Sequence, residues 1–143
     1  MSDKCFLDTN IFVYSYDRSA KAKRSRAQEL IESALQTHRG VISTQVFQEF
    51  LNVSTTKFAK CLTTHDSYRY LDSVLAPLCE VFPSVALYRN ALELREETRY
   101  SFYDSLIITA ALHAGCTTLY SEDLRDGHNV RGLRIRDPFR ASV

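Results

Sequence analysis

Four of the 17 acidic residues stand where a carboxylate is expected to do chemistry rather than only face solvent. Each one follows a predicted strand, borders the apolar stripe of a predicted helix or begins such a helix, and the four are Asp8, Glu49, Asp104 and Asp123. Carboxylates that are brought together repel one another, so their ionised forms need a cation beside them. Because carboxylate oxygens are hard ligands, the cation that this group predicts is Mg²⁺ or Mn²⁺.

Each of these acids also has a purely structural interpretation. Aspartate is a good helix N-cap, so Asp8 and Asp104 can simply cap the helices that follow them. Glu49 can be an exposed helical acid, and Asp123 can shape a turn with Gly127. No local motif joins the four acids. Only the fold can bring them together, because the carboxyl ends of parallel strands share one edge of a sheet.

Strands and helices alternate along the chain. Short apolar runs bounded by turn-forming residues predict strands at 5–7, 41–42, 78–82 and 117–120, and a final strand is predicted at 133–136, before Pro138. Helical periodicity predicts helices at 11–16, 19–38, from 43 or 44 to about 55, 64–77, 84–99 and 106–114, two of them ended by Gly40 and Gly115. This alternation predicts a three-layer α/β/α fold with a mainly parallel sheet of four to five strands. The length of 143 residues predicts a single domain, 1–143.

The overall charge does not indicate a nucleic-acid-binding protein, because the formal net charge is only +1. Two segments are nevertheless basic: residues 18–39 hold six basic residues against two acidic ones, and residues 125–143 hold five against two. Such segments can contact phosphates or can be ordinary solvated surfaces.

The cysteines and the apolar runs indicate a cytoplasmic protein. The four cysteines form no C-x-x-C pair, which favours a reducing compartment over a disulfide scaffold. No signal peptide is recognised, and no run approaches the roughly 20 apolar residues of a membrane span. The histidines are scattered, which argues against a zinc site, and the glycine-rich motifs of nucleotide-binding loops are absent from the sequence.

At the four acids the sequence resembles the PIN-domain family, and within it the VapC-like toxins. The likeness covers nearly the whole chain in the right order and rests on four motifs: Phe6-Leu7-Asp8-Thr9-Asn10, Gln48-Glu49-Phe50, Tyr103-Asp104-Ser105-Leu106-Ile107 and Leu119-Tyr120-Ser121-Glu122-Asp123-Leu124. In the last motif the family pattern is a hydroxyl residue, any residue, then Asp. That pattern selects Ser121 and Asp123, while Glu122 and Asp126 are close enough to remain alternatives to Asp123.

The resemblance implies a Mg²⁺-dependent endoribonuclease, with Mn²⁺ as an alternative cofactor. It assigns Asp8 and Asp104 as the principal metal ligands, Glu49 and Asp123 as the acids that complete the site, and Thr9, Asn10 and Ser121 as supporting hydrogen-bonding residues. Whether one or two metal ions act stays open. A bound metal ion would lower the pKa of the attacking water and stabilise charge on the phosphodiester. RNA affinity would come from the basic segments and from exposed aromatic residues such as Tyr100 and Tyr103, which can equally be packing residues.

The resemblance also implies partners. VapC-like proteins are usually the toxin component of a type II toxin–antitoxin pair. A small antitoxin neutralises them by placing its tail, often through a basic residue, in the acidic groove. They also commonly form homodimers. For this chain we therefore expect an RNA substrate, a small antitoxin protein, a homodimer and no membrane association.

Other functions remain in competition. A haloacid-dehalogenase-like phosphatase needs D-x-D after the first strand, and Asn10 stands where the second acid would be. A receiver-like signalling module needs an acid at the end of a central strand, but the predicted strand at 78–82 is followed by Pro83. A housekeeping RNA-processing PIN nuclease and a PIN domain that only binds RNA or a partner are the remaining alternatives.

Overall fold

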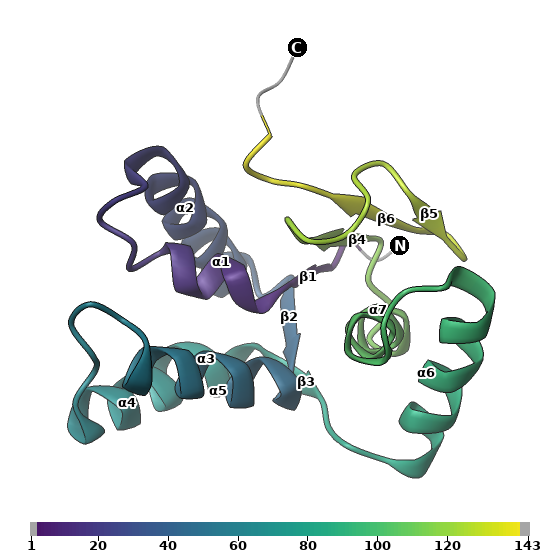
Figure 1. Cartoon of the computed structure of the whole chain (residues 1–143), viewed down its shortest axis with the longest axis horizontal. Coiled ribbons are helices and arrows are strands. Elements are labelled where there is room, and N and C mark those ends of the chain that lie inside the picture. The colour runs from purple at the N-terminus through teal and green to yellow at the C-terminus, as the bar shows by residue number, and fades with distance from the viewer. Residues whose placement is uncertain (1–2, 141–143) are drawn as a thin grey trace.

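A six-stranded sheet organises residues 3–140, the part of the chain that the computed structural model describes (Figure 1). The strands in chain order are β1 Cys5–Leu7, β2 Gly40–Ser43, β3 Cys79–Val81, β4 Thr118–Tyr120, β5 Asn129–Val130 and β6 Leu133–Arg136. In space they follow the order β3-β2-β1-β4-β6-β5. All neighbouring pairs are parallel except β5 with β6, which is antiparallel.

The helices cover both faces of this sheet. They are α1 Thr9–Tyr14, α2 Lys21–Thr37, α3 Thr44–Thr56, α4 Thr64–Tyr70, the π-helical segment η1 Leu71–Leu75, α5 Ala76–Leu78, α6 Val85–Thr98 and α7 Phe102–His113. Figure 1 shows α1 and α2 on one side of the strands and α6 and α7 on the other. This arrangement confirms the predicted three-layer fold with a mainly parallel sheet.

The predicted number of four to five strands was too low, because β5 was missed. This strand has two residues, too few to form an apolar run. It is set by a hairpin whose two loop residues, Arg131 and Gly132, both have positive φ angles (52° and 91°). Two such residues form the kind of tight turn that matches the twist of an antiparallel pair. The backbone conformation of this turn, rather than hydrophobic periodicity, therefore creates the sixth strand.

The strand order reverses between β1 and β4. The chain moves outward from β1 through β2 to β3, then crosses back through α6 and α7 and places β4 on the free side of β1. Such a reversal leaves a crevice at the carboxyl ends of the two central strands, where open α/β sheets bind their ligands. The residues that directly follow β1 and β4 therefore occupy the position of greatest functional interest.

The hydrophobic core is continuous from the strands into the helices. Phe6 of β1, Leu119 of β4 and Ile135 of β6 are fully buried, and Phe6 pairs in register with Leu119. Helix α7 is buried along most of its length, from Ser105 to Ala111, because α6 covers its outer side and the sheet its inner side. Its apolar sequence therefore reflects its place in the middle of this layer.

Two helix ends are formed by other residues than the sequence predicted. Helix α7 begins at Phe102 because Ser101 caps it, so Asp104 lies in the first turn and is not the cap. Helix α2 ends at Thr37 because His38 adopts the left-handed conformation (φ 59°). Gly40 instead opens β2, where an added Cβ would lie 2.1 Å from the Ala34 Cβ. This close approach explains the glycine there.

The segment after α4 runs on past Pro77, which was expected to end the helix. It passes through η1 and α5 to Leu78. In the wider π turn the Ala76 N–H donates to the Leu71 carbonyl, five residues earlier. None of the helices within residues 3–140 combines the length and the apolar character needed to cross a bilayer.

Candidate functional site

Asp8 lies at the strand-order reversal, directly after β1. Its backbone N–H donates to the Tyr120 carbonyl at the end of β4 (3.1 Å). One carboxylate oxygen, Oδ1, accepts from the Thr9 N–H (2.7 Å), so Asp8 caps α1 as the structural interpretation expected. The other oxygen, Oδ2, accepts from the Ser121 hydroxyl (2.7 Å). Capping and membership of an acidic site are therefore compatible, because each oxygen keeps a lone pair for a further partner.

Glu49 reaches the same edge of the sheet from α3. Its Oε1 accepts from the Thr9 hydroxyl (2.6 Å), and its Oε2 lies 3.5 Å from the Gln45 Nε2. Thr9 is 7% exposed, so this contact is well shielded from solvent. Gln45 also donates to the Tyr103 carbonyl in the first turn of α7 (3.3 Å). Sequence reasoning missed Gln45, although its position one helical turn before Glu49 is a usable signal.

Asp123 joins the group from the loop after β4. Its Oδ2 accepts from the Asn10 Nδ2 (2.7 Å), which ties the loop to the first turn of α1. Burial raises the pKa of Asp123, and repulsion from Glu122 and Asp104 raises it further. Asp104 therefore lies within electrostatic reach of Asp123. Its place in the first turn of α7 fits this, because α7 leads into β4 and so begins near the carboxyl edge of the sheet.

The two other acids of the loop after β4 have partners outside this group. Glu122 forms an ion pair with Lys23 of α2 (2.6 Å) and accepts from the Tyr14 hydroxyl (2.6 Å). Asp126 forms an ion pair with Arg140 (3.0 Å). The structure therefore distinguishes the three acids by their partners, and Asp123 alone among them bonds to a residue of the Asp8 motif.

The carboxylates are not neutralised by basic side chains. Within residues 3–140, none of the four predicted acids takes part in an ion pair. Burial raises the pKa of Asp8 to about 6, and repulsion from Glu49 and Asp123 contributes. Hydrogen bonds from Ser121 and from the Thr9 N–H act in the opposite direction. The site thus holds excess negative charge that a cation would relieve.

The donor atoms suit a hard cation that keeps much of its water. Mg²⁺ is usually bound by one or two carboxylates and several waters. In the described part of the chain, no three His, Cys, Asp or Glu side chains form a ready-made metal centre. The Gln45 Oε1, beside Glu49, is a buried acceptor without a partner among these residues. These oxygen donors, which have acceptor capacity to spare, therefore suit Mg²⁺ that keeps some of its waters. They suit a metal ion enclosed entirely by protein ligands less well.

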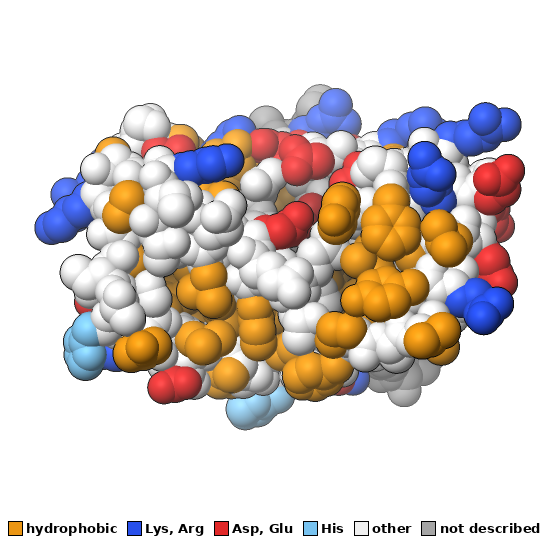
Figure 2. All heavy atoms as spheres, turned by 60° about the horizontal axis from the view of Figure 1, so that its bottom comes forward, with side chains coloured by type: hydrophobic (Ala, Val, Ile, Leu, Met, Phe, Trp, Pro, Cys, Tyr) orange, Lys and Arg blue, Asp and Glu red, His pale blue; other side chains and the backbone are white. Residues whose placement is uncertain are grey.

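Exposed hydrophobic side chains share one face of the molecule with acidic ones. Figure 2 shows acidic side chains near the middle of this face and hydrophobic ones gathered over α6 and α7. Tyr103, next to Asp104, is 65% exposed. Tyr100 is half-buried, and its hydroxyl bonds to the His128 ring (2.9 Å). Of the two predicted RNA-contacting tyrosines, Tyr103 therefore presents an exposed ring and Tyr100 is a packing residue.

The sequence also matches a known domain family. The family model for the PIN domain matches residues 5–129. Among curated proteins no significant match is found. Many solved structures share the fold. One is DNA-bound VapBC from Salmonella typhimurium, with 23% identity, 96% of this chain and 99% of that chain covered, and a TM-score of 0.60.

Two further solved structures resemble this chain to a similar degree. FitAcB from Neisseria gonorrhoeae is 15% identical, with 96% of this chain and 99% of that chain covered and a TM-score of 0.62. The sarcin–ricin-loop-cleaving toxin VapC20 from Mycobacterium tuberculosis is 16% identical, with 84% and 90% covered and a TM-score of 0.58. At these identities the structural likeness establishes the fold.

Proposed function

The chain belongs to the PIN-domain family, and on that premise we propose that it is a Mg²⁺-dependent endoribonuclease, with Mn²⁺ as a possible substitute. The observation that carries this proposal is the group of carboxylates without basic partners at the strand-order reversal. Asp8, Glu49 and Asp123 are linked through Thr9, Ser121 and Asn10, and Asp104 lies within electrostatic reach. A solvated surface would not require such an arrangement.

Asp8 and Asp104 would hold the metal ion, with Glu49 and Asp123 completing the acidic site. When bound, Mg²⁺ lowers the pKa of a coordinated water and stabilises negative charge that develops on a phosphodiester. This chemistry suits the hydrolysis of RNA, whose reacting group is itself an anion. The negative site would repel that anion until the cation neutralises it, which gives the proposed activity a strict metal requirement.

The polar residues around the acids would hold each carboxylate in place. Ser121 fixes the orientation of Asp8 through its hydroxyl, and Thr9 does the same for Glu49. Asn10 holds Asp123 and with it the loop after β4. Hydrogen bonds of this kind set the direction of metal-binding carboxylates, and their loss commonly weakens metal binding or activity.

A cleavage assay with purified protein tests the proposal. Wild type should generate new 5′ ends in a mixed RNA substrate when Mg²⁺ is present and none when EDTA replaces it. Asp8→Asn and Asp104→Asn should each lower the rate by about 10²-fold or more if they remove a metal ligand. Glu93→Gln, an exposed acid on α6, is the matched control and should cleave like wild type. Equal rates for wild type and both Asn variants would refute the catalytic assignment.

We also propose that the protein is the toxin of a toxin–antitoxin pair. The support is that VapBC from Salmonella typhimurium and a Klebsiella pneumoniae toxin–antitoxin complex share its fold over most of both chains. Its small antitoxin would cover the acidic site and place a basic residue there. Induced expression should arrest growth for wild type but not for Asp8→Asn. Cleavage without growth arrest would instead favour a housekeeping RNA-processing nuclease. RNA binding that is unchanged by EDTA, without cleavage, would favour a binding-only domain.

The exposed face of α6 supports the proposed homodimer. Val85, Tyr88 and Leu92 recur at helical spacing on it and are 74%, 42% and 56% exposed. Leu92→Glu should shift the mass measured by light scattering from dimer to monomer. Tyr68→Glu, which changes an exposed tyrosine of α4, should leave the mass unchanged. A wild-type monomer at high concentration would rule out self-association.

A cytoplasmic location completes the proposal. It is supported by the four cysteines, which are all free thiols in the structure. Burial raises the pKa of Cys116 to about 12, so this thiol behaves as a small core side chain and not as a reactive group.

A further inference from the structure

The loop between β4 and β5 carries Asp123 into the acidic group. Its residues adopt bends and turns rather than a helix or a strand. The backbone fixes the loop near its two ends, because the Ser121 N–H donates to the Arg136 carbonyl (2.9 Å) and the Gly127 N–H donates to the Ile135 carbonyl (2.8 Å). Between these two bonds, side-chain contacts must set where Asp123 lies.

Glu122, the residue before Asp123, is held through both of its carboxylate oxygens. Oε1 accepts from the Tyr14 hydroxyl at the end of α1 (2.6 Å), and Oε2 pairs with the Lys23 ammonium of α2 (2.6 Å). The Lys23 Nζ also lies 3.3 Å from the Tyr14 oxygen, so the three polar groups contact one another. Asn10 in the first turn of α1 holds Asp123 itself. Two consecutive loop residues are therefore tied to α1, one near each end of that helix.

Aromatic rings shield the ion pair between Lys23 and Glu122. The Lys23 Nζ lies 4.7 Å from the centroid of the Tyr14 ring and 5.8 Å from that of the Phe139 ring. These two rings pack edge to face, with centroids 5.0 Å apart. The side chains of Lys23 and Glu122 are 39% and 24% exposed. Because the rings displace part of the surrounding water, the two charges attract each other more strongly than a fully exposed pair would.

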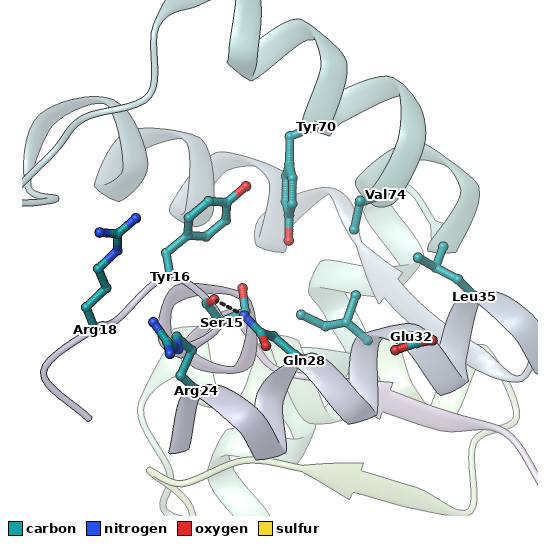
Figure 3. Close-up of a pocket in the computed structure, with 10 residues that line it drawn as sticks. Ser15, Tyr16, Arg18, Arg24, Gln28, Glu32, Leu35, Tyr70 and Val74 are labelled. Carbon is teal, nitrogen blue, oxygen red and sulfur yellow. Dashed lines mark hydrogen bonds between the residues drawn. The ribbon is translucent and has the colours of Figure 1, made fainter. Parts of the chain in front are cut away.

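Helix α2 presents Lys23 from a fixed position. Gln28 of the same helix donates to the Ser15 carbonyl directly after α1 (3.0 Å), a bond drawn in Figure 3. The inner face of α2 is buried in the core through Ala27, Leu30, Ile31 and Ala34. Because α2 is held in this way, the ion pair sets the position of the loop and not that of the helix.

We propose that Lys23 and Tyr14 are positioning residues, which act through Glu122 to hold Asp123 in place for a bound divalent cation. This inference rests on the proposed metal-dependent function. A metal-binding side chain must be held to within about 0.5 Å of its productive position, and an irregular loop needs side-chain anchors for that precision. Lys23 also neutralises Glu122, whose unpaired carboxylate would repel Asp123 and compete with it for the cation.

Substitutions of the ion pair test the proposal. Lys23→Met removes the ammonium, Lys23→Arg keeps a positive charge, and Lys23→Glu combined with Glu122→Lys exchanges the two partners. Lys4→Met is the matched control. The Lys4–Glu80 pair has a similar length (2.7 Å) and similar exposure (34% and 41%), but it lies at the amino end of β1, away from the loop.

Two measurements report on the position of Asp123: Mn²⁺ binding, followed by the EPR signal of the free ion, and the Mg²⁺ concentration that gives half-maximal RNA cleavage. Lys23→Met should weaken Mn²⁺ binding and raise the Mg²⁺ requirement, each by about tenfold or more, as is usual when a partner of a metal site is lost. Lys23→Arg should behave like wild type, and the exchanged pair should recover most of the loss. Tyr14→Phe should have a smaller effect in the same direction, because the ion pair remains. Lys4→Met should match wild type.

Amide hydrogen exchange in EDTA tests the same contact without metal or substrate. Lys23→Met should speed exchange in the loop between β4 and β5, and Lys4→Met should not. The melting temperature of Lys23→Met should change little, because a partly exposed ion pair contributes little to the stability of the whole fold.

Three results would overturn the inference: Mn²⁺ binding by Lys23→Met that equals wild type, a loss that neither Lys23→Arg nor the exchanged pair restores, and slower cleavage at saturating Mg²⁺ with an unchanged Mg²⁺ requirement. The last result would mean that Lys23 contacts the RNA directly. Wild type that binds Mn²⁺ without cleaving RNA would refute the proposed nuclease, while the Mn²⁺ affinities of the variants would still decide whether Lys23 positions Asp123. Wild type that binds no Mn²⁺ would overturn both proposals.

Discussion

Removing the charge of Asp8 should stabilise the protein while it abolishes the proposed activity. Burial and neighbouring acids raise the pKa of Asp8 from 3.8 to about 6 in the folded state. Each pH unit of that difference corresponds to about 1.4 kcal/mol, which gives an upper limit of about 3 kcal/mol. Because Asp8 is only half-buried and solvent screens part of this effect, we expect Asp8→Asn to gain about 1–2 kcal/mol at neutral pH.

The sign of this effect follows from proton binding. The folded state binds the Asp8 proton more tightly than the unfolded state does, so the ionised carboxylate destabilises the fold. This destabilisation is absent below about pH 4 and complete above about pH 6. Asparagine keeps the helix cap, since Asn and Asp are equally good N-cap residues. Its amide can also donate to the Ser121 hydroxyl, so the local geometry should survive.

Urea unfolding in EDTA at several pH values measures the effect. The difference in unfolding free energy between Asp8→Asn and wild type should be near zero at pH 4 and grow to about 1–2 kcal/mol at pH 7.5, or roughly 3–6 °C in the melting temperature. Added Mg²⁺ should then stabilise wild type, by about 2.7 kcal/mol at one hundred times its dissociation constant, and leave Asp8→Asn unchanged.

Asp126→Asn provides a control of opposite sign. The hydrogen bond from the Asp137 N–H and the bond from Arg140 lower the pKa of Asp126, so loss of its charge should reduce stability at neutral pH. The electrostatic reasoning would be refuted if the difference in unfolding free energy between Asp8→Asn and wild type did not change with pH. It would also be refuted if Asp8→Asn lost stability relative to wild type as the pH rose from 4 to 7.5.

Two further predictions concern single contacts. Asn10→Ala removes the bond to Asp123 and should weaken the apparent Mg²⁺ affinity or the cleavage rate by about 10- to 100-fold, measured by titrating Mg²⁺ in the cleavage assay; an unchanged titration curve would contradict this. Gly40→Ala should lower the unfolding free energy by about 1–3 kcal/mol in urea because the new Cβ meets Ala34, and the double change with Ala34→Gly should recover most of that loss. No recovery in the double variant would mean that the close approach is not the cause.

Much of the fold could be predicted from the sequence because its signals are local. The strand at 5–7, a short apolar run, and the strand at 133–136, where buried Leu133 and Ile135 alternate with exposed arginines, were both predicted with their observed bounds. Gly115 ends α7 in the left-handed conformation, as predicted. The errors came where a local signal competes with another one. Ser101 caps α7 ahead of Asp104, and His38 in the left-handed conformation, rather than Gly40, ends α2.

For the candidate site, too, the sequence predicted some features and not others. Sequence motifs selected Asp8, Glu49, Asp104 and Asp123 as a possible group, because residue type and position at element ends can be read along the chain. Which contacts those acids make could not be read, because their partners are distant in sequence. Asn10 and Asp123 are 113 residues apart, and so are Asp8 and Ser121.

The sequence by itself therefore determined which residues can do chemistry and which elements carry them, because both depend on side-chain type and local periodicity. The tertiary structure decided that Asp123, and not Glu122, bonds to the Asp8 motif, because Lys23 of α2 holds Glu122 away through an ion pair. It also decided that Tyr14 and Phe139, from two distant parts of the chain, lie beside the same Lys23. Such features arise only when surfaces from separate elements pack together, and no local sequence pattern predicts which surfaces do so.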